Sequence, residues 1–394
     1  MHDSEDTGNV VTTTSEEELD TFDLQPQAGN SISLSSQLMG LGETLGAKSS
    51  CVLYSRDDNG LSPGLVLTLQ FPNLEALQDR IEVFFKDMNP LLPILNQSEI
   101  VPRIARTLKA LGYNERTGIV CSQTGDAVFL GIILNIVAIA DTEIPELRAG
   151  SARSGWNYFQ QGERLAKYFT GMKRANDLDR ICYYALGAIY LFRQELLRHA
   201  SAYIMHAWNA ATEAGLNDQS SWPRASLATN LTRQKLWWSI YTIDIHIFRR
   251  RGKPYLIREN EVSVAEFVPQ LSLVSKHTAY KDTQVYEHLL GLGDTSIRDM
   301  EYYQTGINLC RLWKQIWDTM FSAKSGRQAD AQDLELLDTR ILYLERITPS
   351  TLKWRGADVI DQHRADSELF DRRRLLCQLV RKPRRVVPSD TLIS

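Results

Sequence analysis

Apolar residues recur at the spacing of amphipathic helices through most of the chain. The first such pattern runs from Asn73 to Met88, with its apolar side chains on one face and Asn73 placed to cap its start. The same spacing predicts further helices near residues 127–140, 151–172, 177–189, 196–214, 233–251, 279–292, 296–322 and 330–348. The body of the chain shows no convincing alternation of apolar and polar residues, which a strand would require. The pattern therefore predicts an all-α fold, an irregular multi-helix bundle of packed αα-hairpins.

The densest pattern lies between Arg233 and Pro254, which reads RQKLWWSIYTIDIHIFRRRGKP. Two adjacent apolar stripes cover more than half of its circumference, namely Leu236, Ile240, Ile243 and Ile247, and Trp237, Tyr241, Asp244 and Phe248. We therefore predict a helix that is buried on most sides, with residues 233–235 and 249–251 in water. Gly252 and Pro254 should end the helix.

Asp244 is the single acid in the apolar part of this helix. A buried carboxylate costs several kcal/mol unless it is paired or hydrogen-bonded. Arg233 lies three turns away, about 16 Å along the axis, so it cannot be the partner. We expect Asp244 to accept hydrogen bonds from backbone N–H groups or to pair with a cation from another segment. It would then tie two segments together, and a contact to a ligand is the alternative.

Small residues recur at about every fourth position in the second half of an apparent αα-hairpin at 177–215. The small residues of this pattern are Ala202, Ala207, Ala210, Ala211, Ala214 and Gly215, and Tyr203 and Leu216 complete it. Small side chains at this spacing let two helices approach closely.

Three patterns together resemble the fungal-specific transcription factor domain, the middle homology region of fungal binuclear zinc-cluster transcription factors. The first is the Trp-Trp-x-x-Tyr-x-x-Asp helix that runs into Gly-Lys-Pro, and the second is the small-residue pattern ending at Gly215-Leu216. The third is the Asn-Pro-x-x-Pro-Ile-Leu turn at residues 89–95. The resemblance covers roughly residues 70–379, and the family's C-terminal helix is expected to begin at 367–379. There the pattern gives way to a basic tail, so we expect a domain truncated at its C-terminus.

This resemblance implies a nuclear, non-enzymatic protein of transcription regulation, with a helical domain that responds to a small-molecule inducer. Its candidate regulatory core is Arg233, Trp237, Trp238, Tyr241 and Asp244. The implied partners are proteins of the transcription machinery or an intact relative. No association with a membrane is expected. A helical-repeat scaffold that binds only proteins is the main alternative, although no period near 34 residues is apparent. An α-helical Mg²⁺ enzyme is a further alternative, because Asp57-Asp58 resembles half of an aspartate-rich motif.

The family's DNA-binding module holds two zinc ions on six cysteines in Cys-x-x-Cys pairs. The five cysteines here are scattered, at Cys51, Cys121, Cys182, Cys310 and Cys377. We therefore expect no zinc and no other cofactor in this chain, and contact with DNA only indirectly or through a missing module. His199 and His206 lie seven residues apart on one predicted helix, about 10 Å along its axis, which is too far to share a metal.

Charge is distributed unevenly along the chain, which has a formal net charge of −4. Residues 1–47 carry nine acids and no Lys or Arg, so the remainder carries +5. We divide the chain into a disordered acidic and Ser-rich segment (1–66), the helical domain (67–380) and a basic tail (381–394). Glu16 to Leu24 resembles an acidic activation segment, or is a solvated tail.

Basic residues cluster near the end of the chain. The candidate nuclear localisation signal is Arg372, Arg373, Arg374, Arg381, Lys382, Arg384 and Arg385. A solvated helix face followed by a tail would give the same pattern. Residues 127–140, the longest apolar run, are too few to span a bilayer and favour a buried helix.

Overall fold

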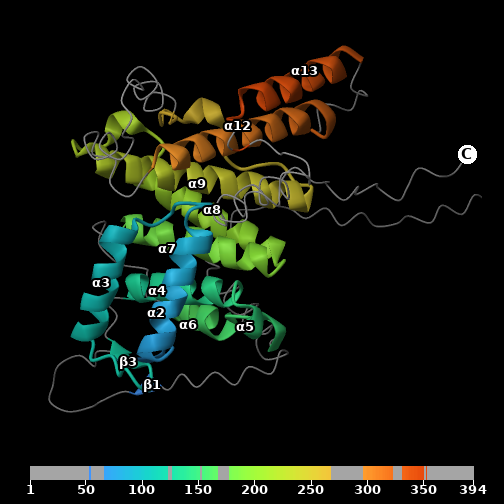
Figure 1. Ribbon diagram of the computed structural model, residues 1–394. Helices are drawn as coiled ribbons and strands as arrows, with labels where there is room; N and C mark the ends of the chain where they lie inside the picture. Colours follow the sequence, from blue (N-terminus) through green and yellow to red (C-terminus); the bar gives the residue numbers. More distant parts are fainter. Residues whose placement is uncertain are drawn as a thin grey trace, which may run out of the picture.

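The computed structural model describes residues 53–54, 66–122, 127–150, 153–166, 177–267, 296–322, 331–349 and 352. Helices make up most of these residues, and Figure 1 shows them stacked in successive layers along the chain. The predicted all-α class is confirmed. The helices predicted at 279–292 and 367–379 lie outside the described residues.

A small antiparallel sheet accompanies the helices, contrary to the expectation of no strand. Its strands are β1 (Leu53–Tyr54), β2 (Val66–Gln70) and β3 (Ile119–Ser122), in the order β1-β2-β3. Leu69 of β2 faces Val120 of β3, and both side chains are buried. Segments of two to five residues are too short for alternation to emerge from the sequence, which is why the sheet was missed. β1 and the first residue of β2 fall within the segment predicted to be disordered.

Two helices and a proline-containing turn follow β2 along the chain. They are α2 (Leu74–Val83), the π-helical turn η1 (Phe84–Met88) and α3 (Gln97–Ala110). The side chain of Asn73 accepts a hydrogen bond from the backbone N–H of Ala76, so the predicted N-cap is confirmed. Asn89 stabilises the turn, because its side-chain amide donates to the carbonyl of Leu95 and its oxygen accepts from the Leu95 N–H.

The core is built around α4 (Ala127–Asp141), in which every side chain is buried. It packs against α2, η1, α6 (Trp156–Ala166) and α7 (Asp177–Arg193). The short α5 (Pro145–Gly150) follows α4 in sequence, and α8 (Leu197–Glu213) packs against α7. The predicted hairpin is confirmed, since α7 packs along α8 with Ala207 and Ala211 fully buried. A Cβ on Gly187 would lie 2.5 Å from the ring of Tyr203, which shows how closely the two helices approach.

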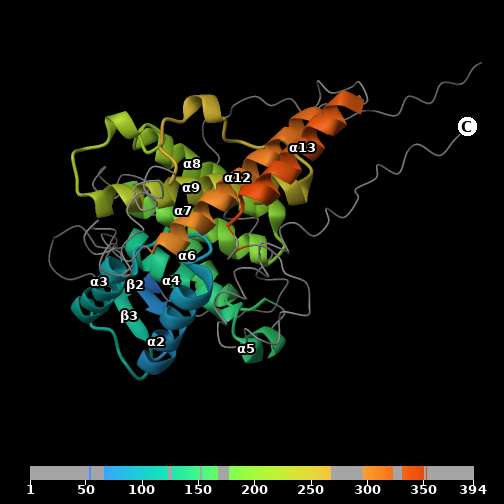
Figure 2. The same ribbon diagram turned by 45° about the horizontal axis from the view of Figure 1, so that its top comes forward.

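The last layers contain the long helix α9 (Leu227–Arg251), with α12 (Ile297–Met320) and α13 (Ala331–Ile347) beyond it. The short 3-10 turns η4 (Gln219–Ser221) and η5 (Glu259–Glu261) flank α9 in sequence. Ser226 caps the start of α9, and Gly252 ends it in the left-handed conformation (φ 62°), as predicted. Figure 2 shows α12 crossing α9 obliquely and α13 lying along α12. The helix predicted from the signature is therefore central to this half of the fold.

Candidate functional site

The aromatic residues of α9 predicted to form the regulatory core are buried. Trp237 and Tyr241 are fully inaccessible, and Trp238 and Asp244 are nearly so. The prediction that α9 is buried on most sides is confirmed. The prediction that residues 233–235 meet water is wrong for Gln234 and Lys235, which are only 3% and 8% exposed.

Asp244 ties α9 to the segment that follows it. Its Oδ2 accepts hydrogen bonds from the backbone N–H groups of Leu256 (2.9 Å) and Ile257 (3.0 Å), so the expected backbone partners are confirmed. Burial raises the pKa of Asp244 to about 6, although the two N–H groups and the nearby Lys314 oppose that rise. The turn at Gly252 thus folds back and is fixed to the helix it ends.

A polar network joins α9, η5 and α12 on the same side. Tyr241 donates its hydroxyl to Oε1 of Glu259 (2.6 Å), and the same oxygen accepts from Nζ of Lys314 (3.2 Å). Arg311 donates to the other oxygen of Glu259 (2.8 Å) and pairs with Glu266 (2.7 Å). Burial acts to raise the pKa of Glu259, but these hydrogen bonds and cations outweigh it and lower the pKa. The network holds Glu259 as a carboxylate between the two helices.

The segment up to Phe267 is fixed at further points. The indole N–H of Trp238 donates to the carbonyl of Ala265 (3.0 Å), and the side-chain amide of Gln234 donates to the same carbonyl (2.6 Å). The N–H of Phe267 donates to Oε1 of Gln304 on α12 (3.0 Å). Residues 252–267 therefore form a strap along α9 and α12, and we call this segment the strap.

Arg233 lies apart from this arrangement. It donates to the carbonyl of Pro223 and to Asn230 (both 3.3 Å), and its guanidinium lies 5.9 Å from the ring centroid of Trp222. The structure therefore brings Trp238, Tyr241 and Asp244 to the strap and leaves Arg233 near the start of α9.

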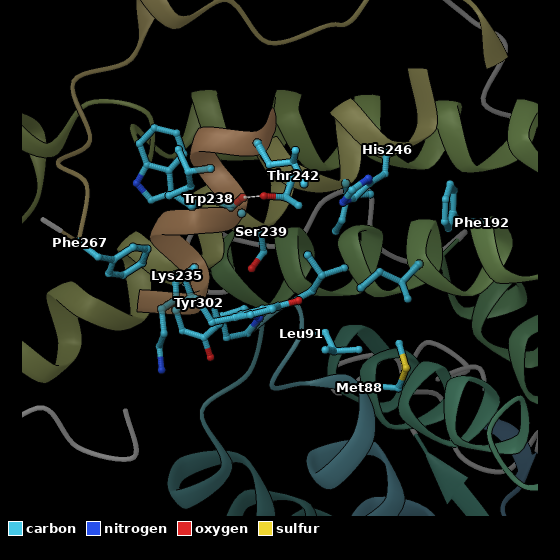
Figure 3. A pocket seen from close by; sticks show the side chains of 18 of the residues that line it. Met88, Leu91, Phe192, Lys235, Trp238, Ser239, Thr242, His246, Phe267 and Tyr302 are labelled. Carbon is cyan, nitrogen blue, oxygen red and sulfur yellow. Dashed lines mark hydrogen bonds between the residues drawn. The ribbon is translucent and has the colours of Figure 1, made fainter. Parts of the chain in front are cut away.

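An apolar cavity of about 140 Å³ lies beside α9 (Figure 3). Five parts of the fold line it, namely the end of η1 with the proline turn, the end of α7, one face of α9, Phe267 at the end of the strap, and α12. Its walls include Met88, Leu91, Phe192, Trp238 and Tyr302. Of the five residues predicted for the regulatory core, only Trp238 lines this space.

Two polar groups in the cavity lack hydrogen-bond partners among the described residues. They are the hydroxyl of Ser239, which is 2% exposed, and Nδ1 of His246. In Figure 3 the Ser239 hydroxyl points from α9 into the space between α9 and the segment that carries Leu91. Burial, with a smaller contribution from Arg249, lowers the pKa of His246 to about 3, so this imidazole is neutral.

The other polar groups of the cavity are engaged. Thr242 donates to the carbonyl of Trp238 (2.8 Å), a bond drawn in Figure 3. Arg193 donates to Thr142 (2.7 Å) and pairs with Glu143. Ser239 and His246 are therefore the groups that remain available to a bound molecule.

The sequence contained a signal for this face of α9. Lys235, Ser239, Thr242 and His246 follow one another at helical spacing and form a polar stripe. It lies beside the stripe of Leu236 and Ile240, on the side away from Trp237 and Tyr241. A polar stripe on a helix predicted to be buried is unusual, because each polar group needs a partner. The elements that face this stripe across the cavity are η1 with the proline turn, α7 and α12. Their approach to α9 is not predictable from the sequence.

The predicted metal and basic sites lie only partly within the described residues. Within the described part of the chain, no group of three or more His, Cys, Asp and Glu side chains could hold a metal ion. Arg250 pairs with Glu195 (3.1 Å), and Arg249 lies 4.9 Å from the ring centroid of Trp313. Asp57-Asp58 and the candidate nuclear localisation residues, 372–374 and 381–385, lie outside the described residues, so those interpretations stay predictions.

A family model described as the fungal specific transcription factor domain matches residues 81–347. The matched region begins in α2, ends with α13, and includes the cavity, α9 and the strap. Comparisons with curated proteins and with solved structures return no match. Among the described residues, the helices are either too short or too polar to cross a bilayer.

Proposed function

This chain belongs to the family of the fungal-specific transcription factor domain, and from that premise we propose that it is a nuclear, non-enzymatic regulator of transcription. Its helical body responds to a small-molecule inducer and controls the activity of the protein assembly that contains it. Its direct partners are proteins of the transcription machinery or a relative with an intact DNA-binding module. It contacts DNA either indirectly or through a module outside this sequence, and the helical body itself binds no cofactor.

The observation that carries this proposal is the cavity beside α9. Concave, largely apolar sites with a few convergent polar groups are typical of small-molecule binding. This cavity lies on the helix that bears the family's signature and is walled on its far side by α12. A ligand there touches both helices at once.

The strap supplies a route from the cavity to the outer layer of the fold. Trp238 lines the cavity with one part of its side chain and donates its indole N–H to Ala265 of the strap. The strap in turn holds α12 through Gln304, Arg311 and Lys314. A ligand that favours one packing of α9 against α12 would bias the position of the strap and of α13.

The proposal is tested by a tethering experiment. The whole chain is fused to a heterologous DNA-binding domain, and transcription is measured from a reporter carrying that domain's site. We expect reporter output to differ from that of the DNA-binding domain alone. It should change again with Gly306→Leu, because Gly306 of α12 lines the cavity and a leucine there would occupy it. Unchanged output for both fusions would contradict a regulatory role.

Localisation is tested separately with a fluorescent fusion. We expect nuclear fluorescence, and a shift to the cytoplasm when the seven basic residues of the predicted signal are replaced by Ala. A cytoplasmic wild-type protein would contradict the nuclear assignment. A nuclear variant would contradict the proposed signal alone.

A further inference from the structure

The size of the cavity limits what it can hold. An engineered cavity of about 150 Å³ in another protein, lined by Leu, Ile and Phe, stays dry and binds benzene. The cavity beside α9 is about 140 Å³ and is likewise walled mainly by aliphatic and aromatic side chains. A single six-membered ring with a small substituent fills such a space.

Ser239 sets the polar requirement of the site. Its hydroxyl is buried and without a partner among the described residues, which costs free energy unless something bonds to it. A hydroxyl can both donate and accept, and His246 offers a second unpartnered nitrogen two helical turns further along α9. Both groups are uncharged, so they suit a neutral polar substituent.

We propose that this cavity binds a small, uncharged ring compound carrying a hydroxyl group, with the ring against Trp238 and Leu91 and the hydroxyl bonded to Ser239. The inference rests on the proposed function, because it names the class of molecule to which the domain responds. Simple phenols and cyclic alcohols have this chemistry.

The charges around the cavity argue against both cationic and anionic ligands. No residue that lines the cavity is acidic, so a cationic ligand has no counter-charge there. Arg193 is committed to Thr142 and Glu143, and Figure 3 shows the side chain of Lys235 extending beside Tyr302, away from Ser239. An anion beside Ser239 would be desolvated among apolar side chains without a cation directed at it.

Gly306 on α12 allows the site to be blocked without harm to the fold. It lines the cavity, and a Cβ built on it meets no atom within 4 Å. Its backbone is helical, so a larger residue is favoured there over glycine. Gly306→Leu should therefore fill the space with its own side chain, and Gly306→Ala should leave most of it open.

The test measures binding of phenol, toluene and benzoate to the full chain by calorimetry and by ligand-induced shifts of the unfolding temperature. We expect phenol to bind and to raise the unfolding temperature. Toluene should bind more weakly than phenol, and benzoate should bind most weakly. Ser239→Ala should lower the affinity for phenol by about five- to tenfold, which corresponds to one neutral hydrogen bond. The affinity for toluene should not change. Gly306→Leu should abolish binding of phenol while it unfolds at the same or a higher temperature, and Gly306→Ala should still bind.

Each contrary result overturns the proposal. Equal binding of phenol and toluene, or no effect of Ser239→Ala, would show that the hydroxyl is not recognised. Tighter binding of benzoate would show a site for anions, and binding that survives Gly306→Leu would place the ligand elsewhere. Because the reporter assay uses no probe ligand, absence of phenol binding alongside a reporter effect of Gly306→Leu would overturn this inference and leave the regulatory function standing.

Discussion

Oδ2 of Asp244 accepts a hydrogen bond of 3.0 Å from the backbone N–H of Ile257, thirteen residues further along the chain. The bond joins the centre of α9 to the strap just before Glu259, the residue that receives Tyr241, Arg311 and Lys314. The buried carboxylate of Asp244 therefore fixes the position of the first part of the strap. The ion pairs of Glu259 with Arg311 and Lys314 depend on that position.

Replacement of Asp244 should separate its structural role from its charge. Asp244→Ala leaves the N–H groups of Leu256 and Ile257 without an acceptor, so we expect it to lower the unfolding free energy by about 2–4 kcal/mol. Asp244→Asn keeps an oxygen acceptor in a side chain of the same shape, so its unfolding free energy should fall much less. Chemical denaturation measures both variants, and the reporter fusion follows function. An Asp244→Ala protein with wild-type stability and reporter output would refute the role of the tie.

The pH dependence of stability should carry the signature of the same residue. The folded-state pKa of Asp244 is about 6, above its ordinary value of 3.8, so the folded state binds more protons between these values. The unfolding free energy should therefore fall as the pH rises from about 4 to about 6, by at most about 3 kcal/mol from this group, and then level off.

The variant Asp244→Asn isolates this contribution, because it cannot ionise and the other titrating groups cancel in the comparison. The stability of Asp244→Asn relative to the wild type should rise through the same pH window and stay constant above it. A difference that is independent of pH between 4 and 7 would mean that the pKa of Asp244 is not raised.

Glu259 should be the most sensitive ionisable residue of the strap. Glu259→Gln removes the negative charge shared by Arg311 and the largely buried Lys314, so we expect a loss of about 1–3 kcal/mol in unfolding free energy. The matched control is Glu195→Gln, which breaks the exposed pair with Arg250 and should cost less than about 0.5 kcal/mol. Urea denaturation at neutral pH compares the two, and equal losses would argue against the network.

Two helical glycines should respond in opposite directions to the same substitution. Gly187→Ala places a methyl group 2.5 Å from the Tyr203 ring, which is buried beside Phe159, so we expect a loss of about 1–3 kcal/mol. Gly306→Ala meets open space within α12 and should gain up to about 1 kcal/mol from helix propensity. Thermal unfolding of the two variants measures the contrast, and a stable Gly187→Ala protein would show that α7 and α8 are not closely packed there.

Local patterns in the sequence predicted most of the helices and the burial of α9, but they did not predict α3 (Gln97–Ala110). Helical periodicity depends only on neighbouring positions, so the residues around Trp237, the stop at Gly252 and the small-residue face of α8 were all predictable. Burial also required Asp244 to have a partner, because a lone carboxylate in an apolar setting is costly.

Only the tertiary structure decided which partners those residues have. These partners come from segments whose approach depends on how the layers pack. They are the N–H groups that bind Asp244, the carboxylate that accepts the Tyr241 hydroxyl, and the residues around Ser239. The short strands of the sheet were also settled at this level, because each is stabilised by a strand distant in the sequence. The cavity could not be predicted for the same physical reason. It is the space left where five parts of the fold fail to fill the volume between them, and no local pattern encodes it.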